Sequence, residues 1–129
     1  MEIIDKTGHP MMGDNEIDAI NAVLKEHRPK ICLEWGSGNS TVYFPIENPF
    51  IQEWIAIEHN KVYIEILQDK LPKNASITLV GLSKYVDYPK TLGKKFDFIF
   101  IDGMFRYACV GEAFNLISEN GVILLHPLS

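Results

Sequence analysis

Apolar residues recur along this chain in two alternating patterns, and the first is the stripe of an amphipathic helix. Residues 15–26 carry isoleucine, valine and leucine at helical spacing, and Asp14 stands where an N-cap is expected. A second stripe follows Asn60, another capping residue, and occupies residues 61–71. The sequence therefore predicts two capped helices that each bury one face.

The second pattern is a short, nearly continuous apolar run, which suits a strand covered on both faces. A third helical stripe, in residues 106–118, is predicted to end at a left-handed C-cap formed by Asn120 and Gly121. Two proline-containing stretches, residues 44–50 and 88–95, are predicted loops. The apolar runs predict five strands, at residues 30–34, 53–58, 76–80, 95–102 and 121–126.

Strands that alternate with helices and are too apolar to face water predict an α/β fold. We expect a doubly wound sandwich with a mostly parallel sheet of about five strands and helices on both faces. No repeat, linker or low-complexity tract interrupts the pattern. One domain is therefore expected over residues 1–129, with an N-terminal segment and helix in residues 1–27 and the core in residues 28–129.

The composition is that of an ordinary globular protein, with 129 residues, 47% hydrophobic and 22% charged. A formal net charge of −5 without a basic run lacks the electrostatic footprint of proteins that bind nucleic acid or anionic membranes. We therefore expect neither nucleic acid nor a membrane as partner. Cys32 and Cys109 form no metal-type or redox pair and are expected to be buried thiols. Without an apolar membrane span or a leader-like N-terminus, the predicted location is cytoplasmic.

Three predicted strands end in carboxylates, at Glu34, Glu58 and Asp102. In a parallel sheet these ends meet at one edge, where ligands bind at the switch of strand order. Gly36 and Gly38 follow the first acid, and they would let the chain turn sharply and a ligand lie against bare backbone. We therefore predict a ligand-binding loop at this edge of the sheet.

The residues around this loop disfavour a dinucleotide. Thr41 stands where the third glycine of GxGxxG is needed, and Glu34 would repel a pyrophosphate. Glu34 would suit an ammonium group, and Glu58, about 20 residues beyond the glycines, can accept hydrogen bonds from both hydroxyls of a ribose. A ligand with both groups is S-adenosylmethionine.

At these residues the chain resembles class I S-adenosylmethionine-dependent methyltransferases. "LEWGSGNST" is similar to their first motif and "IAIEHN" to their second, while "FDFIFIDG" and "NGVILLH" resemble their fourth and fifth strands. The resemblance covers residues 28–126 and implies a Rossmann-like sheet of order 3-2-1-4-5 with S-adenosylmethionine as cofactor. It implies methyl transfer to a small-molecule acceptor, with a hydroxyl group favoured.

The resemblance also assigns roles to residues. Glu34 would lie near the methionine ammonium, Glu58 would bind the ribose, and Asp102 would face the methyl group and substrate. In the third-strand loop Leu82 and Ser83 would contact adenine, where the family usually offers an acid. The full predicted cofactor set is Glu34, Gly36, Ser37, Gly38, Ser40, Thr41, Glu58, His59, Leu82, Ser83 and Asp102.

Candidate bases for the transfer are Asp102, His126 and, in the N-terminal segment, His9. Some O-methyltransferases of this fold bind a metal through Asp102's position and a second acid after strand five. Here that second acid is replaced in "LLHPLS", so we expect no metal. Arg106, after the strand-four "DG", is a candidate contact to the substrate.

Plainer roles remain open for each residue. The glycines could serve only a turn, Glu34 and Glu58 could be exposed strand ends, and Asp102 could cap the next helix. The fifth strand would be an exposed apolar edge, so we also expect self-association through it or a place in something larger. The alternatives are thus a domain that binds S-adenosylmethionine or a partner without catalysis, and, less favoured, a fragment of a nucleotide-binding oxidoreductase.

Overall fold

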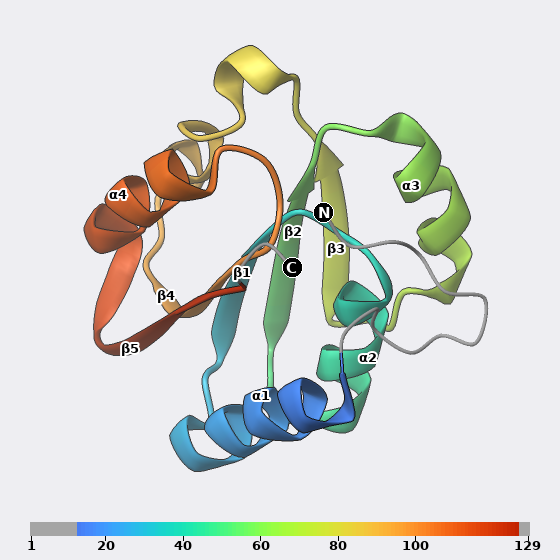
Figure 1. Ribbon diagram of the computed structural model, residues 1–129, viewed down its shortest axis with the longest axis vertical. Helices are drawn as coiled ribbons and strands as arrows, with labels where there is room; N and C mark the ends of the chain where they lie inside the picture. The colour runs from blue at the N-terminus through green and yellow to red at the C-terminus, as the bar shows by residue number, and fades with distance from the viewer. Residues whose placement is uncertain (1–12, 127–129) are drawn as a thin grey trace.

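The computed structural model describes residues 13–126, which form a five-stranded, all-parallel sheet of order β3-β2-β1-β4-β5 (Figure 1). The predicted fold class and strand order are both confirmed. The strands are β1 (Ile31–Trp35), β2 (Glu53–Glu58), β3 (Ala75–Leu79), β4 (Phe96–Ile101) and β5 (Ile117–Leu125). The helices are α1 (Asp14–His27), α2 (Asn39–Glu47), α3 (Lys61–Leu67) and α4 (Arg106–Leu116).

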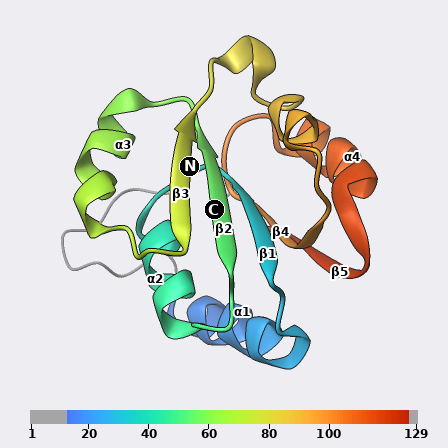
Figure 2. The ribbon, with the colours of Figure 1, turned by 180° about the vertical axis from the view of Figure 1, so that it is seen from behind.

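Helices cover both faces of the sheet. Successive residues of the central strands point to opposite sides, and the apolar side chains on each side pack against helices. Cys32 and Phe98 pack with α1 and with Phe44 of α2, whereas Leu33 and Ile99 belong to the cluster that includes the buried face of α4. Figures 1 and 2 show α1 and α2 next to each other, with α3 and α4 on opposite sides of the molecule. The central strands β1, β2 and β4 are almost wholly buried.

The two edge strands are less covered than their apolar sequences predict. In β3 Ser76 and Leu79 are exposed, and in β5 Glu119, Asn120 and Leu125 are exposed while the other residues are half-buried. Within the described residues β5 pairs with β4 alone. Self-association through the β5 edge stays a prediction.

The first helix begins one residue earlier than predicted, and its cap is different. Gly13 is the N-cap residue, in an extended conformation, and Asp14 lies inside the first turn. The prediction of Asp14 as N-cap is therefore wrong. Asp14 and Glu16 instead place negative charge in the first turn, where it is favourable to the helix dipole.

The helix α2 was missed, because Pro45 lies within it and led us to predict a loop over residues 44–50. A proline inside a helix removes one backbone hydrogen bond. Burial compensates here, since Phe44 and Pro45 are both buried and Phe44 stacks near Trp54 with ring centroids 6.1 Å apart. The helix ends where Asn48 donates its backbone N–H to the carbonyl of Phe44, so only the last part of the stretch is a turn.

The prediction of Asn60 as N-cap is confirmed, since its Oδ1 accepts a hydrogen bond of 3.0 Å from the backbone N–H of Val62. The α-helix it starts ends at Leu67, before the predicted residue 71. A 3-10 turn, η1 (Gln68–Lys70), continues the path and leads to Pro72. A second predicted loop, residues 88–95, likewise contains a 3-10 turn, η3 (Tyr88–Leu92).

The predicted C-cap at Asn120 and Gly121 is wrong. The helix α4 ends at Leu116 and β5 begins at once, so both residues lie in a strand. Gly121 has no positive φ; its glycine is needed because a Cβ there would lie 2.6 Å from Ile117 Cδ1 and 3.0 Å from the carbonyl oxygen of Asp97. The close approach coincides with an irregular register between β4 and β5 at Phe96 and Phe98. No helix in residues 13–126 is long and apolar enough to cross a membrane.

Candidate functional site

The loop after β1 and the turn after β4 meet at the carboxyl edge of the sheet through two glycines. Gly36 has φ of +101°, and a Cβ there would lie 3.0 Å from the Asp102 carbonyl oxygen and 3.1 Å from Gly103 Cα. The predicted sharp turn is therefore present at Gly36, but the space that its missing side chain leaves holds backbone rather than a ligand. Gly38 has φ of 170°, an extended conformation open to any residue.

Glu58 ends β2 and is 2% exposed. Its Oε1 accepts a hydrogen bond from the Ser37 hydroxyl. Its Oε2 accepts one of 2.9 Å from the Asn60 backbone N–H and lies 3.3 Å from His59 Nδ1. Four predicted cofactor positions, Gly36, Ser37, Glu58 and His59, are thus together at one point of the sheet edge.

Glu34 lies deeper, with no exposed surface at all. Its Oε1 accepts hydrogen bonds from Thr41 Oγ1 at 2.7 Å and from Trp54 Nε1 at 2.9 Å, and its Oε2 accepts one from Ser40. These bonds tie the start of α2 to the sheet, and Thr41 also accepts the Gly38 N–H at 3.2 Å. The structure gives Glu34, Ser40 and Thr41 a scaffolding role, so their contact with a cofactor stays a prediction.

Asp102 follows β4 and is 4% exposed. It does not cap α4, whose N-cap is Phe105 in a left-handed conformation. Its Oδ1 lies 2.9 Å from His126 Nδ1 and 3.6 Å from a guanidinium nitrogen of Arg106. Burial raises the pKa of Asp102 above its usual value, although the charges of His126 and Arg106 act to lower it.

The predicted bases Asp102 and His126 are therefore in contact, and Arg106 interacts with both, with the carboxylate of Asp102 and with the backbone carbonyl of His126. Its guanidinium donates hydrogen bonds to the backbone carbonyls of His126 and Gly103. Contact between Arg106 and a substrate stays a prediction. The third candidate base, His9, lies outside the described residues.

Sequence reasoning missed Glu16, whose Oε2 lies 2.7 Å from His126 Nε2. The two residues are 110 positions apart, and no local motif links them. His126 is thus held between two carboxylates, with Asp102 on one ring nitrogen and Glu16 on the other. Both ring nitrogens can donate hydrogen bonds at once only when the ring carries two protons.

The region predicted for adenine lies beside a buried tyrosine. Leu82 and Ser83, in the 3-10 turn η2 (Leu82–Lys84), are both exposed, with Leu82 at 45%. Tyr85 has no exposed surface, and its backbone carbonyl accepts a hydrogen bond of 3.1 Å from Trp35 Nε1. Tyr85 is therefore part of the core. Burial raises the pKa of its hydroxyl.

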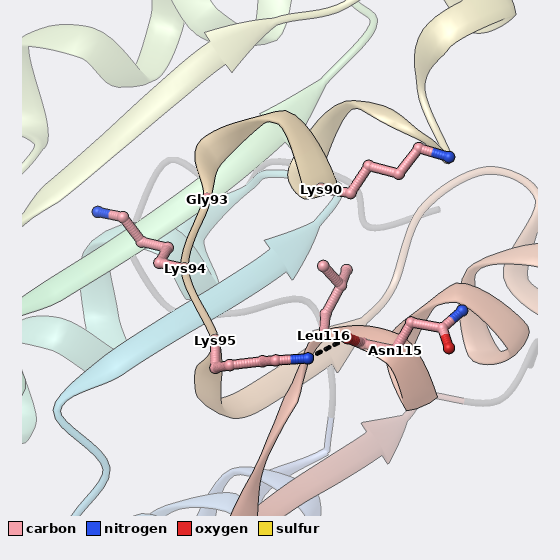
Figure 3. A pocket seen from close by; sticks show the side chains of 6 residues that line it. All are labelled: Lys90, Gly93, Lys94, Lys95, Asn115 and Leu116. Carbon is pink, nitrogen blue, oxygen red and sulfur yellow. Dashed lines mark hydrogen bonds between the residues drawn. The ribbon is translucent and has the colours of Figure 1, made fainter.

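A cavity of about 260 Å³ lies beside the start of β4 and the end of α4, away from the carboxyl ends of the strands. Lys90, Lys94 and Lys95 line it, but their amino groups do not converge (Figure 3). Lys95 Nζ donates to the Asn115 carbonyl at 2.7 Å, and Lys94 pairs with Glu53 at 3.1 Å. Lys90 Nζ lies 3.6 Å from Asp87 Oδ1. This cavity is not a credible anion site, because the three amino groups point apart and each has a partner.

The two cysteines are buried and free, as predicted, and burial raises the pKa of Cys109 to about 12. Among residues 13–126 no group of three or more His, Cys, Asp or Glu side chains is arranged to hold a metal ion.

No family model and no curated protein matches this chain in sequence. Its fold, however, matches solved structures. A candidate caffeoyl-CoA O-methyltransferase from Staphylococcus aureus superimposes with a TM-score of 0.74 at 19% identity, over 90% of this chain and 58% of that one. A candidate O-methyltransferase from Klebsiella pneumoniae gives 0.75 at 17% identity, over 88% and 56%.

A third match, a Streptococcus mutans protein described as a candidate S-adenosylmethionine-dependent methyltransferase, gives a TM-score of 0.62 at 15% identity, over 83% of this chain and 33% of that one. The chain spans little more than half the length of the first two structures. At these identities the likeness concerns the fold. The chain has the Rossmann-like fold of S-adenosylmethionine-dependent methyltransferases, in 129 residues.

Proposed function

We propose that this protein binds S-adenosylmethionine and transfers its methyl group to a small molecule, with a hydroxyl as the acceptor. The observation that carries the proposal is the Glu58 carboxylate, buried at the end of β2 beside the Gly36 loop. Its Oε1 already accepts a hydrogen bond from the Ser37 hydroxyl. A ribose hydroxyl would donate to this carboxylate in the same way.

The residues present fit such a cofactor in part. Glu58 would hold the ribose, Ser37 and His59 would flank it, and the backbone at Gly36 and Gly38 would line the methionine end. When bound, S-adenosylmethionine supplies a methyl group on a positively charged sulfur, which is already activated for displacement. The protein's own contribution would be to align the acceptor and take its proton, and Asp102 and His126 are the groups at hand.

A second candidate is a domain that binds S-adenosylmethionine or a partner and catalyses nothing. One observation favours it: Asp102 is paired with Arg106 and His126, and both ring nitrogens of His126 face carboxylates. Groups that satisfy one another in this way do not need a substrate. Only turnover separates this candidate from the first.

Calorimetric titration with S-adenosylhomocysteine tests the cofactor site, with NAD as the competing ligand and Glu58→Ala as the variant. We expect micromolar binding to the wild type, about −8 kcal/mol, weakened at least about ten-fold in Glu58→Ala, and no binding of NAD. Glu53→Ala, at the opposite end of β2 and half-exposed, is the matched control and should bind as the wild type does. Equal binding by Glu58→Ala and wild type would contradict the proposed site.

If S-adenosylhomocysteine binds, Asp102→Asn distinguishes the two candidates. A methyltransferase would keep binding and lose most of its transfer to the acceptor. A protein that shows no transfer to any of a broad set of phenols and alcohols in either form, while still binding the cofactor, would fit the second candidate.

A further inference from the structure

Tyr85 carries a buried hydroxyl group that the core does not satisfy. The residue has no exposed surface, and within residues 13–126 its Oη has no hydrogen-bond partner. Burial raises the pKa of this hydroxyl, and the Met104 backbone N–H, which can only donate to the oxygen, acts to lower it. A donor cannot accept the hydroxyl proton, so this proton has no acceptor. Buried polar groups are nearly always paired, and an unpaired one calls for an explanation.

The hydroxyl lies where the loop after β1 meets the turn after β4. A Cβ on Gly103 would overlap Tyr85 Oη and would lie 3.0 Å from Gly36 Cα, so the oxygen fills the space that a side chain at Gly103 would need. The strand β1 pairs with β2 on one side and with β4 on the other, which makes this the point where the strand order reverses. Ligands of doubly wound sheets bind at such a point.

Neighbouring groups hold Tyr85 and so fix the direction of its hydroxyl. Trp35 Nε1 donates to its backbone carbonyl at 3.1 Å. The rings of His59 and Phe105 contact the Tyr85 ring edge to face, with centroids 6.1 and 6.2 Å away. Phe105 has φ of +52°, a strained conformation for a residue with a side chain, and it is 46% exposed. Relaxation of Phe105 would move the turn of residues 103–105 and let a ligand reach the covered hydroxyl.

We infer that the Tyr85 hydroxyl donates a hydrogen bond to the carboxylate at the methionine end of S-adenosylmethionine. The inference rests on the proposed function, in which the ribose lies at Glu58 and the methionine end lies along Gly36 and Gly38. The hydroxyl beside Gly36 is at that end, where the carboxylate is the acceptor because the ammonium group can only donate. Glu34 and Glu58 would repel an isolated anion, but the ammonium group on the same carbon offsets this repulsion.

The substitution Tyr85→Phe removes the hydroxyl and keeps the ring. Without ligand, we expect the urea midpoint of unfolding to stay the same or to rise, because an unpaired buried polar group is lost. Tyr88→Phe makes the same change at a half-buried residue that packs against the same core cluster, and it should leave the midpoint unchanged. A lower midpoint for Tyr85→Phe alone would mean that the protein already satisfies the hydroxyl, and would overturn the inference.

Calorimetric titration with S-adenosylhomocysteine measures the contact itself. A hydrogen bond from a hydroxyl to a carboxylate is among the stronger ones, so Tyr85→Phe should weaken binding at least about ten-fold. Tyr88→Phe should bind as the wild type does. Equal affinities of Tyr85→Phe and wild type would overturn the inference.

Decarboxylated S-adenosylhomocysteine, which keeps the ammonium group, identifies the group that the hydroxyl contacts. The wild type should prefer S-adenosylhomocysteine to this analogue, and the preference should fall at least about ten-fold in Tyr85→Phe, which lacks the donor to the carboxylate. A preference of the same size in the two proteins would overturn the assignment to the carboxylate.

The wild type and Glu58→Ala separate this inference from the proposed function. Failure of the wild type to bind S-adenosylhomocysteine would contradict the proposed function. If the wild type binds it, and Glu58→Ala weakens the binding while Tyr85→Phe does not, the inference about Tyr85 is wrong and the proposed function stands.

Discussion

The two halves of the sheet edge are built from different chemistry. At the ends of β1 and β2 the carboxylates of Glu34 and Glu58 are satisfied mostly by uncharged donors, from hydroxyls, an indole and a backbone N–H. At the ends of β4 and β5 the partners of Asp102 are a guanidinium and an imidazole. Hydrogen bonds from neutral donors to a buried carboxylate fix one geometry, whereas an ion pair can be rearranged by a proton or a ligand.

The difference suggests a division of labour. In the β1–β2 half the two carboxylates are buried and hydrogen-bonded, and in the β4–β5 half the carboxylate of Asp102 is paired with a guanidinium and an imidazole. In the proposed function the first half would bind the cofactor and the second would serve the acceptor. If the halves differ in this way, substitutions in them should change stability by different amounts and with different pH dependence.

The largest effect is expected from Glu34→Ala. The change removes the buried acceptor of the Thr41 hydroxyl and of the Trp54 indole N–H, and each buried donor left unpaired costs about 1–3 kcal/mol. We expect the free energy of unfolding to fall by more than about 3 kcal/mol in urea, followed by far-UV circular dichroism. Glu53→Ala, which breaks only a half-exposed ion pair with Lys94, should cost less than about 1 kcal/mol. A small effect of Glu34→Ala would mean that this half is not the rigid one.

Sequence reasoning recovered the first half better than the second, for a physical reason. Ser37 follows β1 and Glu58 ends β2, and these two strands pair directly, so the predicted strand ends suffice to bring the two residues together. The pair of Glu16 and His126 depends on how α1 crosses the sheet beside β5, which no local pattern records.

The errors in the fold have the same origin. Asn120 and Gly121 have the residue types of a helix C-cap, and only the register of β5 against β4 makes Gly121 a site of close approach. Proline is typical of loops, but Pro45 lies in a helix whose neighbouring residue Phe44 is buried against Trp54 of the sheet. Tertiary packing overrides local preference at these positions.

A smaller effect is expected from Gly36→Ala, which tests the junction between the two halves. The position combines φ of +101° with backbone of Asp102 and Gly103 only 3.0 to 3.1 Å from the new Cβ. We expect a loss of about 2–3 kcal/mol of unfolding free energy, from backbone strain and from the forced separation of the two loops. Gly93→Ala also has a positive φ, +65°, but its Cβ would meet nothing within 4 Å, so it should cost about 1 kcal/mol.

Equal losses in the two glycine variants would mean that the strain alone matters and that the contact between the halves does not.

The smallest effect is expected in the pH dependence of the unfolding free energy. It compares Asp97, near the start of β4, with Asp102, which follows the end of β4. Burial acts to raise the pKa of Asp97, but hydrogen bonds from the Ile31 N–H, the Ser118 hydroxyl and the Lys30 N–H lower it below its usual value. Its contribution to stability is therefore present above the unfolded pKa, near 3.9, and is lost as the pH falls through the folded value. Asp97→Asn should cost about 1 kcal/mol near pH 7, and this cost should shrink in acid.

Asp102 should behave in the opposite way, because burial raises its pKa in spite of His126 and Arg106. Between the unfolded value and this raised value the folded state binds more protons, so the contribution of Asp102 to stability decreases as the pH rises. Asn resembles the neutral carboxyl, and Asp102→Asn should therefore gain stability relative to wild type as the pH rises, while Asp97→Asn loses it. Urea unfolding of the three proteins from about pH 3.5 to 7 measures both slopes. Slopes of the same sign would mean that Asp102 is as well satisfied as Asp97, and that the β4–β5 half is as much a fixed scaffold as the other.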